Sequence, residues 1–251
     1  MTAGILIFAT ILSRSMGRNS YFNFKQFMVL QEHAAMKVGI DGVLLGAWAR
    51  LGGASTILDV GTGTGLLALM AAQRSTALVD AVELEAGAAS EAGINFQNSP
   101  WSSRLRLFVS AFQHFEADHP YDHILSNPPF FDNSPWPADL KRAQARHADT
   151  LTLSELLAGA KTMLQPEGRI SLILPAEYEE RLRSLVRENG LFVNRLDRVA
   201  PNETKKPHRL LAEISASPDW TETGLILIRH AGSADYSQQY RELTKDFYLA
   251  F

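Results

Sequence analysis

A glycine-rich segment between a predicted strand and a predicted helix constrains this chain more than any other feature. The segment, Asp59–Gly65, reads DVGTGTG and joins the short apolar run Thr56–Val60 to a second apolar sequence that starts at Leu66. Glycines let the backbone turn tightly and approach a ligand closely beside a helix N-terminus. Because simple turn formation explains three alternating glycines poorly, the segment predicts an α/β fold with a ligand over this turn.

Strand and helix patterns alternate through the first three quarters of the chain. The short apolar runs that predict strands are Thr56–Val60, Val79–Glu83, Leu105–Val109, Tyr121–Leu125 and Arg169–Leu174. The segments that predict helices are Asp41–Leu51, with Asp41 near its N-cap, Leu66–Arg74, Ala86–Gln97, Leu153–Leu164 and Ala176–Asn189. This alternation indicates βαβ units and therefore a doubly wound, mostly parallel sheet.

The alternation ends in the last quarter of the chain. Phe192–Val199 and Arg209–Ala216 are two strand-like runs joined by a loop with Pro, Lys and His, which predicts an antiparallel hairpin at the sheet edge. With this hairpin the sheet is expected to have seven strands. The apolar run Leu225–Ile228 and a helix around Tyr236–Tyr248 complete the domain.

The domain organisation is expected to be simple. No boundary is visible within residues 21–251, so we expect one domain there. The preceding residues, 1–20, are expected to form a disordered extension, with Met16 as an alternative start. Their apolar run Ile5–Leu12 is short and has no Lys or Arg before it, which makes a poor signal peptide.

Composition excludes several classes of protein. The net charge of −3 argues against a protein that coats nucleic acid through bulk positive charge, although a local basic patch remains compatible. The chain has no cysteine, which excludes disulfides and thiolate metal sites and is compatible with the cytoplasm. Its seven histidines lack ligand spacing, so no metal is expected. No apolar stretch is long enough to span a membrane.

A second motif, Asn127-Pro128-Pro129-Phe130, follows the predicted strand Tyr121–Leu125. Prolines fix φ and offer no N–H, so the turn has a surplus of carbonyl acceptors. Asn127 adds a side-chain carbonyl, and Phe130 adds a ring face for stacking. The motif is therefore suited to holding a planar amine. An ordinary turn is the alternative, because Asn-Pro and Pro-Pro are common in loops.

The residues alone leave two cofactors open. The segment Gly63–Ala68 fits the G-x-G-x-x-G/A fingerprint of dinucleotide sites, which keeps NAD possible. Asp59, two positions before the first glycine, favours S-adenosylmethionine because its carboxylate can reach an ammonium group through water or a backbone group. Glu83 ends a strand where it can accept from ribose hydroxyls of either cofactor, and we prefer it to Glu85. The cofactor-binding candidates are Asp59, Gly61, Thr62, Gly63, Gly65, Glu83, Ser110 and Asn127.

The two motifs together resemble class I S-adenosylmethionine-dependent methyltransferases that modify amino nitrogens. More narrowly, the chain resembles the bacterial tRNA(Val) N6-adenine methyltransferase family. The narrower resemblance covers nearly the whole chain from about Tyr21. Its segments are Phe24–Phe27, Ala35–Gly39, Asp41–Trp48, Ile57–Ala72, Asp80–Glu83, Ser99–Trp101, Ser126–Asn133, Arg142–His147 and Thr244–Leu249.

The resemblance implies a Rossmann-like fold and transfer of a methyl group to N6 of the adenine beside the anticodon, position 37, of a valine tRNA. In such a family the glycine turn and Asp59 would hold the methionine part of the cofactor and Glu83 its ribose. The catalytic residues would be Asn127, Pro128, Pro129 and Phe130.

Two residues depart from the family pattern on the cofactor side. Family members usually carry Thr where Ile40 stands, so any hydroxyl contact is lost. Many relatives also have a carboxylate after the third strand, where Ser110 offers only a hydroxyl and backbone, which puts the contact to the cofactor's adenine in doubt.

The expected partner is the anticodon stem-loop of a valine tRNA. Arg142, Arg146 and His147 follow the catalytic turn and can meet phosphates, although a solvated helix end is an equal alternative. Lys205, Lys206 and Arg209 cluster around the hairpin loop, which suits backbone contact. We also include Asp41 among the substrate-binding candidates. The chain is expected to act as a monomer.

Other functions remain open. The same Asn-Pro-Pro-aromatic turn serves methyltransferases of protein glutamine and of guanine N2 in ribosomal RNA. An NAD-dependent oxidoreductase would need a catalytic Tyr-Lys or His-carboxylate pair, which the sequence does not display. An inactive cofactor-binding adaptor is disfavoured by the intact Asn127–Phe130 turn.

Overall fold

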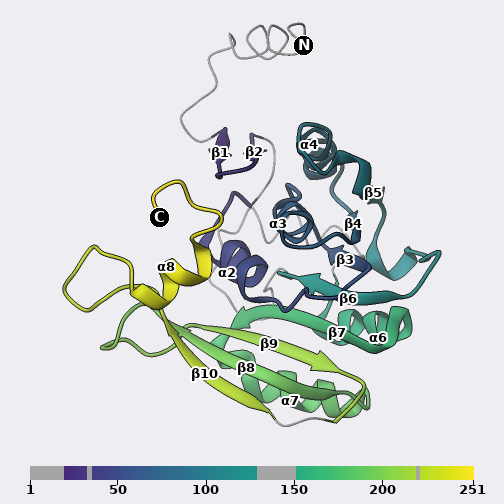
Figure 1. Cartoon of the computed structure of the whole chain (residues 1–251). Helices are drawn as coiled ribbons and strands as arrows, with labels where there is room; N and C mark the ends of the chain where they lie inside the picture. Colours follow the sequence, from purple (N-terminus) through teal and green to yellow (C-terminus); the bar gives the residue numbers. More distant parts are fainter. Residues whose placement is uncertain (1–19, 33–35, 129–150, 219–220) are drawn as a thin grey trace, which may run out of the picture.

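The computed structural model describes residues 20–32, 36–128, 151–218 and 221–251. An eight-stranded sheet in the order β10-β8-β9-β7-β6-β3-β4-β5 carries the fold (Figure 1). Only β9 runs antiparallel to its neighbours, and the other paired strands are parallel. The strands are β3 (Thr56–Val60), β4 (Leu78–Glu83), β5 (Leu105–Val109), β6 (Tyr121–Ser126), β7 (Leu164–Pro175), β8 (Phe192–Ala200), β9 (Arg209–Ser215) and β10 (Glu222–Leu227).

The doubly wound, mostly parallel sheet and the antiparallel β8–β9 hairpin are confirmed, but the expected count of seven strands was wrong. The third apolar run forms β10, an eighth strand that pairs in parallel with β8. The hairpin is therefore not at the edge of the sheet, because β10 covers the outer side of β8. Hydrophobic periodicity could not predict this pairing, because it shows which face of a strand is buried and not which strand lies next to it.

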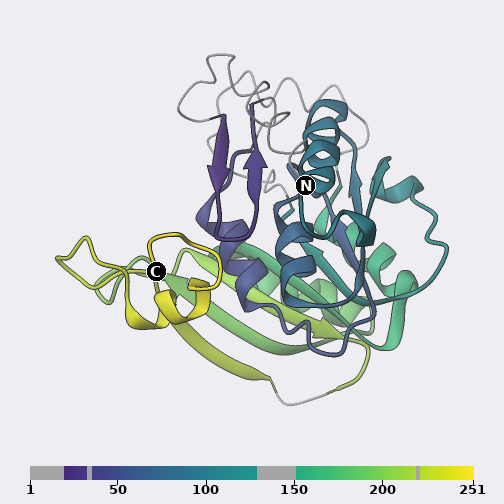
Figure 2. The same cartoon turned by 45° about the horizontal axis from the view of Figure 1, so that its top comes forward.

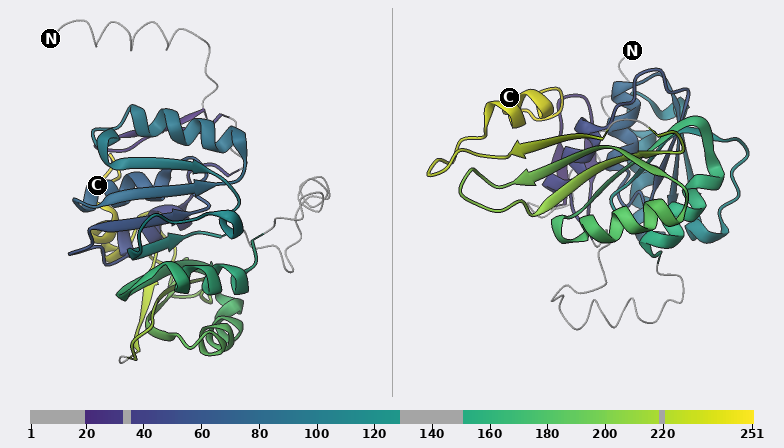
Figure 3. Two further views of the ribbon diagram at one scale, coloured as in Figure 1. Left: turned by 90° about the vertical axis from the view of Figure 1, so that its right-hand side faces the viewer. Right: turned by 90° about the horizontal axis from the view of Figure 1, so that it is seen from below.

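Helices cover both faces of the sheet. One apolar core contains α2 (Ile40–Trp48), α3 (Leu66–Arg74) and α4 (Ala86–Gln97), and the other contains α6 (Leu153–Met163) and α7 (Glu179–Glu188). The right panel of Figure 3 shows α6 and α7 along the side of the sheet opposite to α8 (Gln238–Thr244) and the C-terminus. This two-sided burial explains why apolar residues of β3 and β6 do not simply alternate with polar ones. Among the described residues, no helix is long and apolar enough to cross a membrane.

Several helix boundaries differ from expectation. The predicted helix Ala176–Asn189 is a short 3₁₀ turn, η3 (Ala176–Tyr178), followed by α7. The C-terminal helix is shorter than Tyr236–Tyr248 because Ser237, whose hydroxyl accepts from the Tyr240 N–H, caps its start. Helix α2 begins one residue before Asp41, with Gly39 at the N-cap and no side-chain cap.

A small second sheet was not expected from the sequence. Strands β1 (Tyr21–Asn23) and β2 (Met28–Leu30) pair in antiparallel fashion and lie beside α4 (Figure 2). The side chain of Asn95 on α4 accepts from the Leu30 N–H at 2.8 Å and donates to the Leu30 carbonyl at 3.0 Å. Three-residue strands are too short to show an alternating pattern, so only this contact reveals them.

Parallel pairing brings the carboxyl ends of β3, β4, β5, β6 and β7 to one edge of the sheet. The glycine turn follows β3, Glu83 ends β4, Ser110 follows β5 and Asn127 follows β6. Ligands of open α/β sheets bind at this edge. The fold therefore brings the predicted cofactor-binding residues to one edge of the sheet, although they span much of the sequence.

The glycine turn gives a test of local packing. Gly65 has a φ of 87°, and a Cβ there would lie 2.5 Å from Cε1 of Phe96. We expect Gly65→Ala to lose about 1–2 kcal/mol from the left-handed backbone and a further 1–3 kcal/mol or so from the clash. Gly53 is the matched control, because its φ is 82° and a Cβ there meets nothing within 4 Å. Urea unfolding of both variants checks this, and equal losses would contradict it.

Candidate functional site

The glycine turn after β3 is held by its own backbone and is open on its outer side. Gly61, Gly63 and Gly65 all have positive φ, at 71°, 57° and 87°. The N–H groups of Gly61 and Thr62 donate to the Val82 carbonyl at 2.9 and 3.1 Å, which fixes the turn to β4. A Cβ at Gly61 or Gly63 would meet no atom within 4 Å, so these two glycines are required by conformation and border open space.

The side chain of Asp59 stabilises the glycine turn through hydrogen bonds. Its carboxylate is fully buried and accepts from the Thr62 hydroxyl at 2.5 Å and from the Ala68 N–H at 3.1 Å. Its other oxygen has no partner among the described residues. Burial, the largest cause, raises the pKa of the Asp59 carboxyl from 3.8 to about 7. Asp59 thus organises the loop and the first turn of α3, a role that its sequence spacing did not reveal.

The two acidic residues after β4 have different surroundings. Glu85 caps α4, since its carboxylate accepts from the N–H groups of Gly87 and Ala88 at 2.9 and 2.6 Å. Glu83 is half-buried and accepts from the Gly63 N–H at 2.8 Å, so it lies against the glycine turn. The choice of Glu83 over Glu85 as the ribose ligand stays a prediction, and Glu83 is the one of the two whose carboxylate bonds to the glycine turn.

The region beside Glu83 contains two apolar residues that sequence reasoning missed. Leu84 and Val109 are 45% and 62% exposed at the ends of β4 and β5. Ser110 follows Val109, and its N–H donates to the Glu83 carbonyl at 3.0 Å. Large apolar side chains at the ligand edge of a sheet suit a flat aromatic ligand. Their position, Leu84 directly after one predicted strand and Val109 at the end of the next, was a signal that the sequence already contained.

Asn127 extends from the end of β6 into this edge. The preceding residue, Ser126, is fully buried and its hydroxyl donates to the Val60 carbonyl at 2.8 Å, which fixes the direction of the chain. The side-chain Oδ1 of Asn127 is buried and has no hydrogen-bond partner among the described residues. A buried amide oxygen without a partner is costly, so it is ready to accept from a ligand. Pro128 is buried, while Pro129 and Phe130 lie outside the described residues.

The predicted RNA-binding residues are only partly described. Arg209 donates from Nε to Asp41 Oδ2 at 2.7 Å, so these two candidates neutralise each other. Lys205 and Lys206 are exposed on the loop between β8 and β9. Arg142, Arg146 and His147 lie outside the described residues, as do residues 1–19 of the expected extension.

Comparison with known proteins identifies the family. Residues 43–192 match the methyltransferase small domain. A protein of Parabacteroides distasonis named tRNA1(Val) (adenine(37)-N6)-methyltransferase is 44% identical over 233 residues, which cover 92% of this chain and 98% of the relative. The chain belongs to this methyltransferase family. The family resemblance read from the sequence is thereby confirmed.

Solved structures agree at the level of the fold. A predicted O-methyltransferase from Agrobacterium tumefaciens matches with a TM-score of 0.64 at 18% identity, over 82% of this chain and 96% of that one. The glycopeptide N-methyltransferase MtfA, crystallised with S-adenosyl-L-methionine, matches with a TM-score of 0.53 at 15% identity, over 73% and 98%. The Rossmann-like methyltransferase fold is therefore shown, and S-adenosylmethionine is the cofactor of this family.

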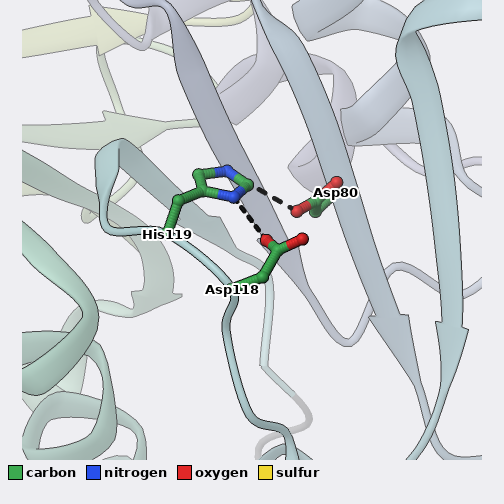
Figure 4. Close-up of side chains that lie close together, drawn as sticks. All are labelled: Asp80, Asp118 and His119. Carbon is green, nitrogen blue, oxygen red and sulfur yellow. Dashed lines mark hydrogen bonds and ion pairs between the residues drawn. The ribbon is translucent and has the colours of Figure 1, made fainter.

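One cluster among the described residues has the spacing of metal ligands. Ligand atoms of Asp80, Asp118 and His119 lie within 4.8 Å of one another (Figure 4). The Arg106 guanidinium donates to both Asp80 oxygens at 2.7 Å and to both Asp118 oxygens at 3.1 and 3.2 Å, and the Tyr121 hydroxyl donates to Asp80 at 2.7 Å. A cation would have to displace this guanidinium, so the cluster is best read as an ion-pair network near the start of β6. The absence of a metal remains a prediction.

Burial of Asp59 predicts a pH-dependent stability. The folded carboxyl keeps its proton to about pH 7, whereas the unfolded chain releases it near 3.8, so its stabilising contribution is lost as pH rises through this window. Asp59→Asn keeps an oxygen acceptor but does not titrate. Relative to this variant, the wild type should lose up to about 4 kcal/mol of unfolding free energy between roughly pH 4 and pH 7. Urea unfolding across this range measures it.

The control is Asp246→Asn, which removes an exposed carboxyl. It should follow the pH dependence of the wild type. If Asp59→Asn also follows the wild type, the buried carboxyl is not the titrating group.

Proposed function

We propose that this protein transfers the methyl group of S-adenosylmethionine to N6 of the adenine at position 37 of a valine tRNA. The observation that carries the chemistry is the buried Asn127 Oδ1, which has no partner among the described residues. It lies at the same sheet edge as the open glycine turn, where the cofactor of this fold binds. The chain's relatives are named for this reaction, which selects it among amine methylations.

The residues present fit the cofactor. The open outer side of Gly61 and Gly63 leaves room for a ligand, Glu83 offers carboxylate oxygens to its ribose, and Leu84 and Val109 offer apolar contact to its adenine. The cofactor supplies a methyl group that is already electrophilic on a sulfonium centre. The task of the protein is therefore chiefly to position the amine.

Asn127 would hold that amine. The exocyclic N6 of adenine is conjugated with its ring and is a poor nucleophile. When it donates to Asn127 Oδ1 and to the Pro128 carbonyl, the acceptors stabilise positive charge that develops on nitrogen during transfer. No strong general base is required, and the proton can leave after transfer. A base in a folded loop must leave its stack to reach this position.

Backbone contacts to the RNA are assigned to Lys205 and Lys206. Both are exposed on a loop at the edge of the sheet that also carries Asn127. Arg209, which is paired with Asp41, would instead stabilise the start of this region. Charged side chains that contact phosphates raise affinity without reading sequence.

Asn127→Ala tests the amine-holding role. We expect the rate of methyl transfer to fall by about 10²–10³, as when one charge-stabilising group is removed, with nearly unchanged affinity for the cofactor. The conservative variant Asn127→Asp keeps the oxygen acceptor and should lose less. Single-turnover kinetics and calorimetry with the cofactor measure the two effects. Loss of cofactor binding in Asn127→Ala would show that the residue acts mainly on the cofactor.

The substrate is tested directly with labelled cofactor and an extract of the tRNA, ribosomal RNA and protein of a strain that lacks the protein. Mass spectrometry of the labelled nucleoside should find N6-methyladenosine at position 37 of valine tRNA. Label in ribosomal RNA guanine or in protein glutamine would instead favour the two related amine substrates. Label in protein alone would overturn the assignment.

A further inference from the structure

A side chain of α4, Asn95, contacts the glycine turn from a distant part of the sequence. Its Nδ2 group donates to the Thr64 carbonyl at 2.8 Å, although the two residues are 31 positions apart. Thr64 lies between Gly63 and Gly65, two of the glycines with positive φ. Asn95 is 1% exposed, so the hydrogen bond is shielded from water and its loss would leave a buried carbonyl without this donor.

The orientation of the Asn95 amide is fixed by the β1–β2 hairpin. Its Oδ1 accepts from the Leu30 N–H at 2.8 Å, and its Nδ2 donates to the Leu30 carbonyl at 3.0 Å. The opposite placement of the amide oxygen and nitrogen would set the oxygen against the carbonyls of both Leu30 and Thr64. The two bonds to Leu30 therefore hold the amide plane, and the remaining N–H is directed at the glycine turn.

The peptide group between Thr64 and Gly65 is consequently held at both ends. Its carbonyl accepts from Asn95, and its N–H donates to the Thr62 carbonyl at 2.9 Å. The next residue of α4, Phe96, lies against the same glycine, since a Cβ at Gly65 would be 2.5 Å from its Cε1. Two successive residues of α4 thus hold the second half of the turn, one by a hydrogen bond and the other by packing.

The glycine content of the turn makes this second anchor important. The bonds to β4, at the Val82 carbonyl and the Glu83 carboxylate, come from N–H groups of residues 61–63. Glycine has no Cβ to restrict the adjoining peptide groups, so the peptide group before Gly65 can flip at little steric cost unless it is held. A turn that samples several orientations loses conformational entropy when a ligand orders it, whereas a preorganised turn binds more tightly.

We propose that Asn95 is a positioning residue for the cofactor, which holds the Thr64 carbonyl, preorganises the glycine turn and thereby raises its affinity for S-adenosylmethionine. The inference rests on the part of the proposed function that places this cofactor on the turn. Asn95 acts through the backbone of the turn and is not a catalytic residue. Because Leu30 holds the Asn95 amide, the β1–β2 hairpin supports the cofactor site from behind α4.

The test measures cofactor affinity by calorimetry in the absence of RNA. Asn95→Ala removes the donor to the Thr64 carbonyl and should raise the Kd for S-adenosylmethionine about tenfold, as expected for the loss of a buried hydrogen bond. Single-turnover methyl transfer at saturating cofactor should stay within about threefold of wild type, because Asn127, which holds the amine, follows a different strand. A general loss of stability would not separate affinity from rate in this way.

Glu91→Ala is the matched control on the same helix. Glu91 is buried one helical turn before Asn95, and its carboxylate accepts from the Glu32 N–H at 2.5 Å, two residues after Leu30. The variant therefore loosens the same part of the chain from α4 but keeps the donor to the glycine turn. Its Kd for the cofactor should stay within about twofold of wild type.

Hydrogen exchange of the free protein tests the positioning without any ligand. The Gly65 N–H should exchange several-fold faster in Asn95→Ala, because the peptide group that carries it has lost one of its two bonds. Asn189→Ala removes an amide donor to the Leu185 carbonyl at the end of α7 and should leave this exchange rate unchanged. Urea unfolding shows that each variant is folded at the temperature of the measurements.

Asn95→Asp is the second variant, for the case in which Asn95→Ala does not fold. It keeps the size of the side chain and the oxygen that accepts from the Leu30 N–H. Its carboxylate cannot donate to the Thr64 carbonyl, so the Kd for the cofactor should rise at least as much as in Asn95→Ala.

The outcomes distinguish the two proposals. If a folded Asn95 variant binds the cofactor as tightly as the wild type, the inference is overturned and the proposed function stands. If Glu91→Ala weakens cofactor binding as much as Asn95→Ala, attachment of the hairpin and not the bond to the turn is responsible, which also overturns the inference. If the wild type binds the cofactor but methylates no tRNA, the proposed function fails, and the Kd values still decide the role of Asn95.

Discussion

The backbone turn after β3 is the constraint on which the rest of the site depends. Its three positive-φ glycines bend the chain, two N–H groups donate to Val82 on the neighbouring strand, and the buried Asp59 carboxyl ties Thr62 to the first turn of α3. The bonds to Val82 join the turn to β4, and the bond from the Ala68 N–H to Asp59 joins α3 to β3. The turn therefore fixes β3, β4 and α3 relative to one another, and with them the sheet edge where Glu83 and Asn127 lie.

The sequence predicted most elements of this edge correctly, because apolar runs and glycines close in sequence determine where these strands and helices begin and end. Strand β3 and helices α3 and α4 have the bounds expected from apolar runs and glycine punctuation. Contacts between residues far apart in sequence were not predictable. The ion pair between Asp41 and Arg209 joins residues 168 positions apart, and nothing in either segment indicates its partner. The same limit hid the parallel pairing of β10 with β8, since side-chain periodicity is equal for either neighbour.

The function of individual site residues was partly visible in the sequence. Asp59 was chosen from its position two residues before the first glycine and Glu83 from its position at a strand end. The structure gives Asp59 a further role, because its fully buried carboxylate holds the Thr62 hydroxyl. Leu84 and Val109 were overlooked because apolar residues at the end of a strand usually indicate more core. Only their exposure distinguishes them from core residues, and exposure is a property of the folded chain.

The structure changes the interpretation of Ile40, which stands where the family usually has Thr. As a departure from the Thr of the family pattern, it first suggests a lost contact to the cofactor. In the structure Ile40 lies in the first turn of α2 and is 39% exposed, and it projects from roughly the face opposite to the glycines that pack against α3. Its neighbour Asp41 accepts from Arg209 Nε at 2.7 Å, which ties the start of this helix to the edge of the sheet where β7 ends and β9 begins. The missing Thr hydroxyl therefore falls beside this ion pair and not on the glycine turn after β3.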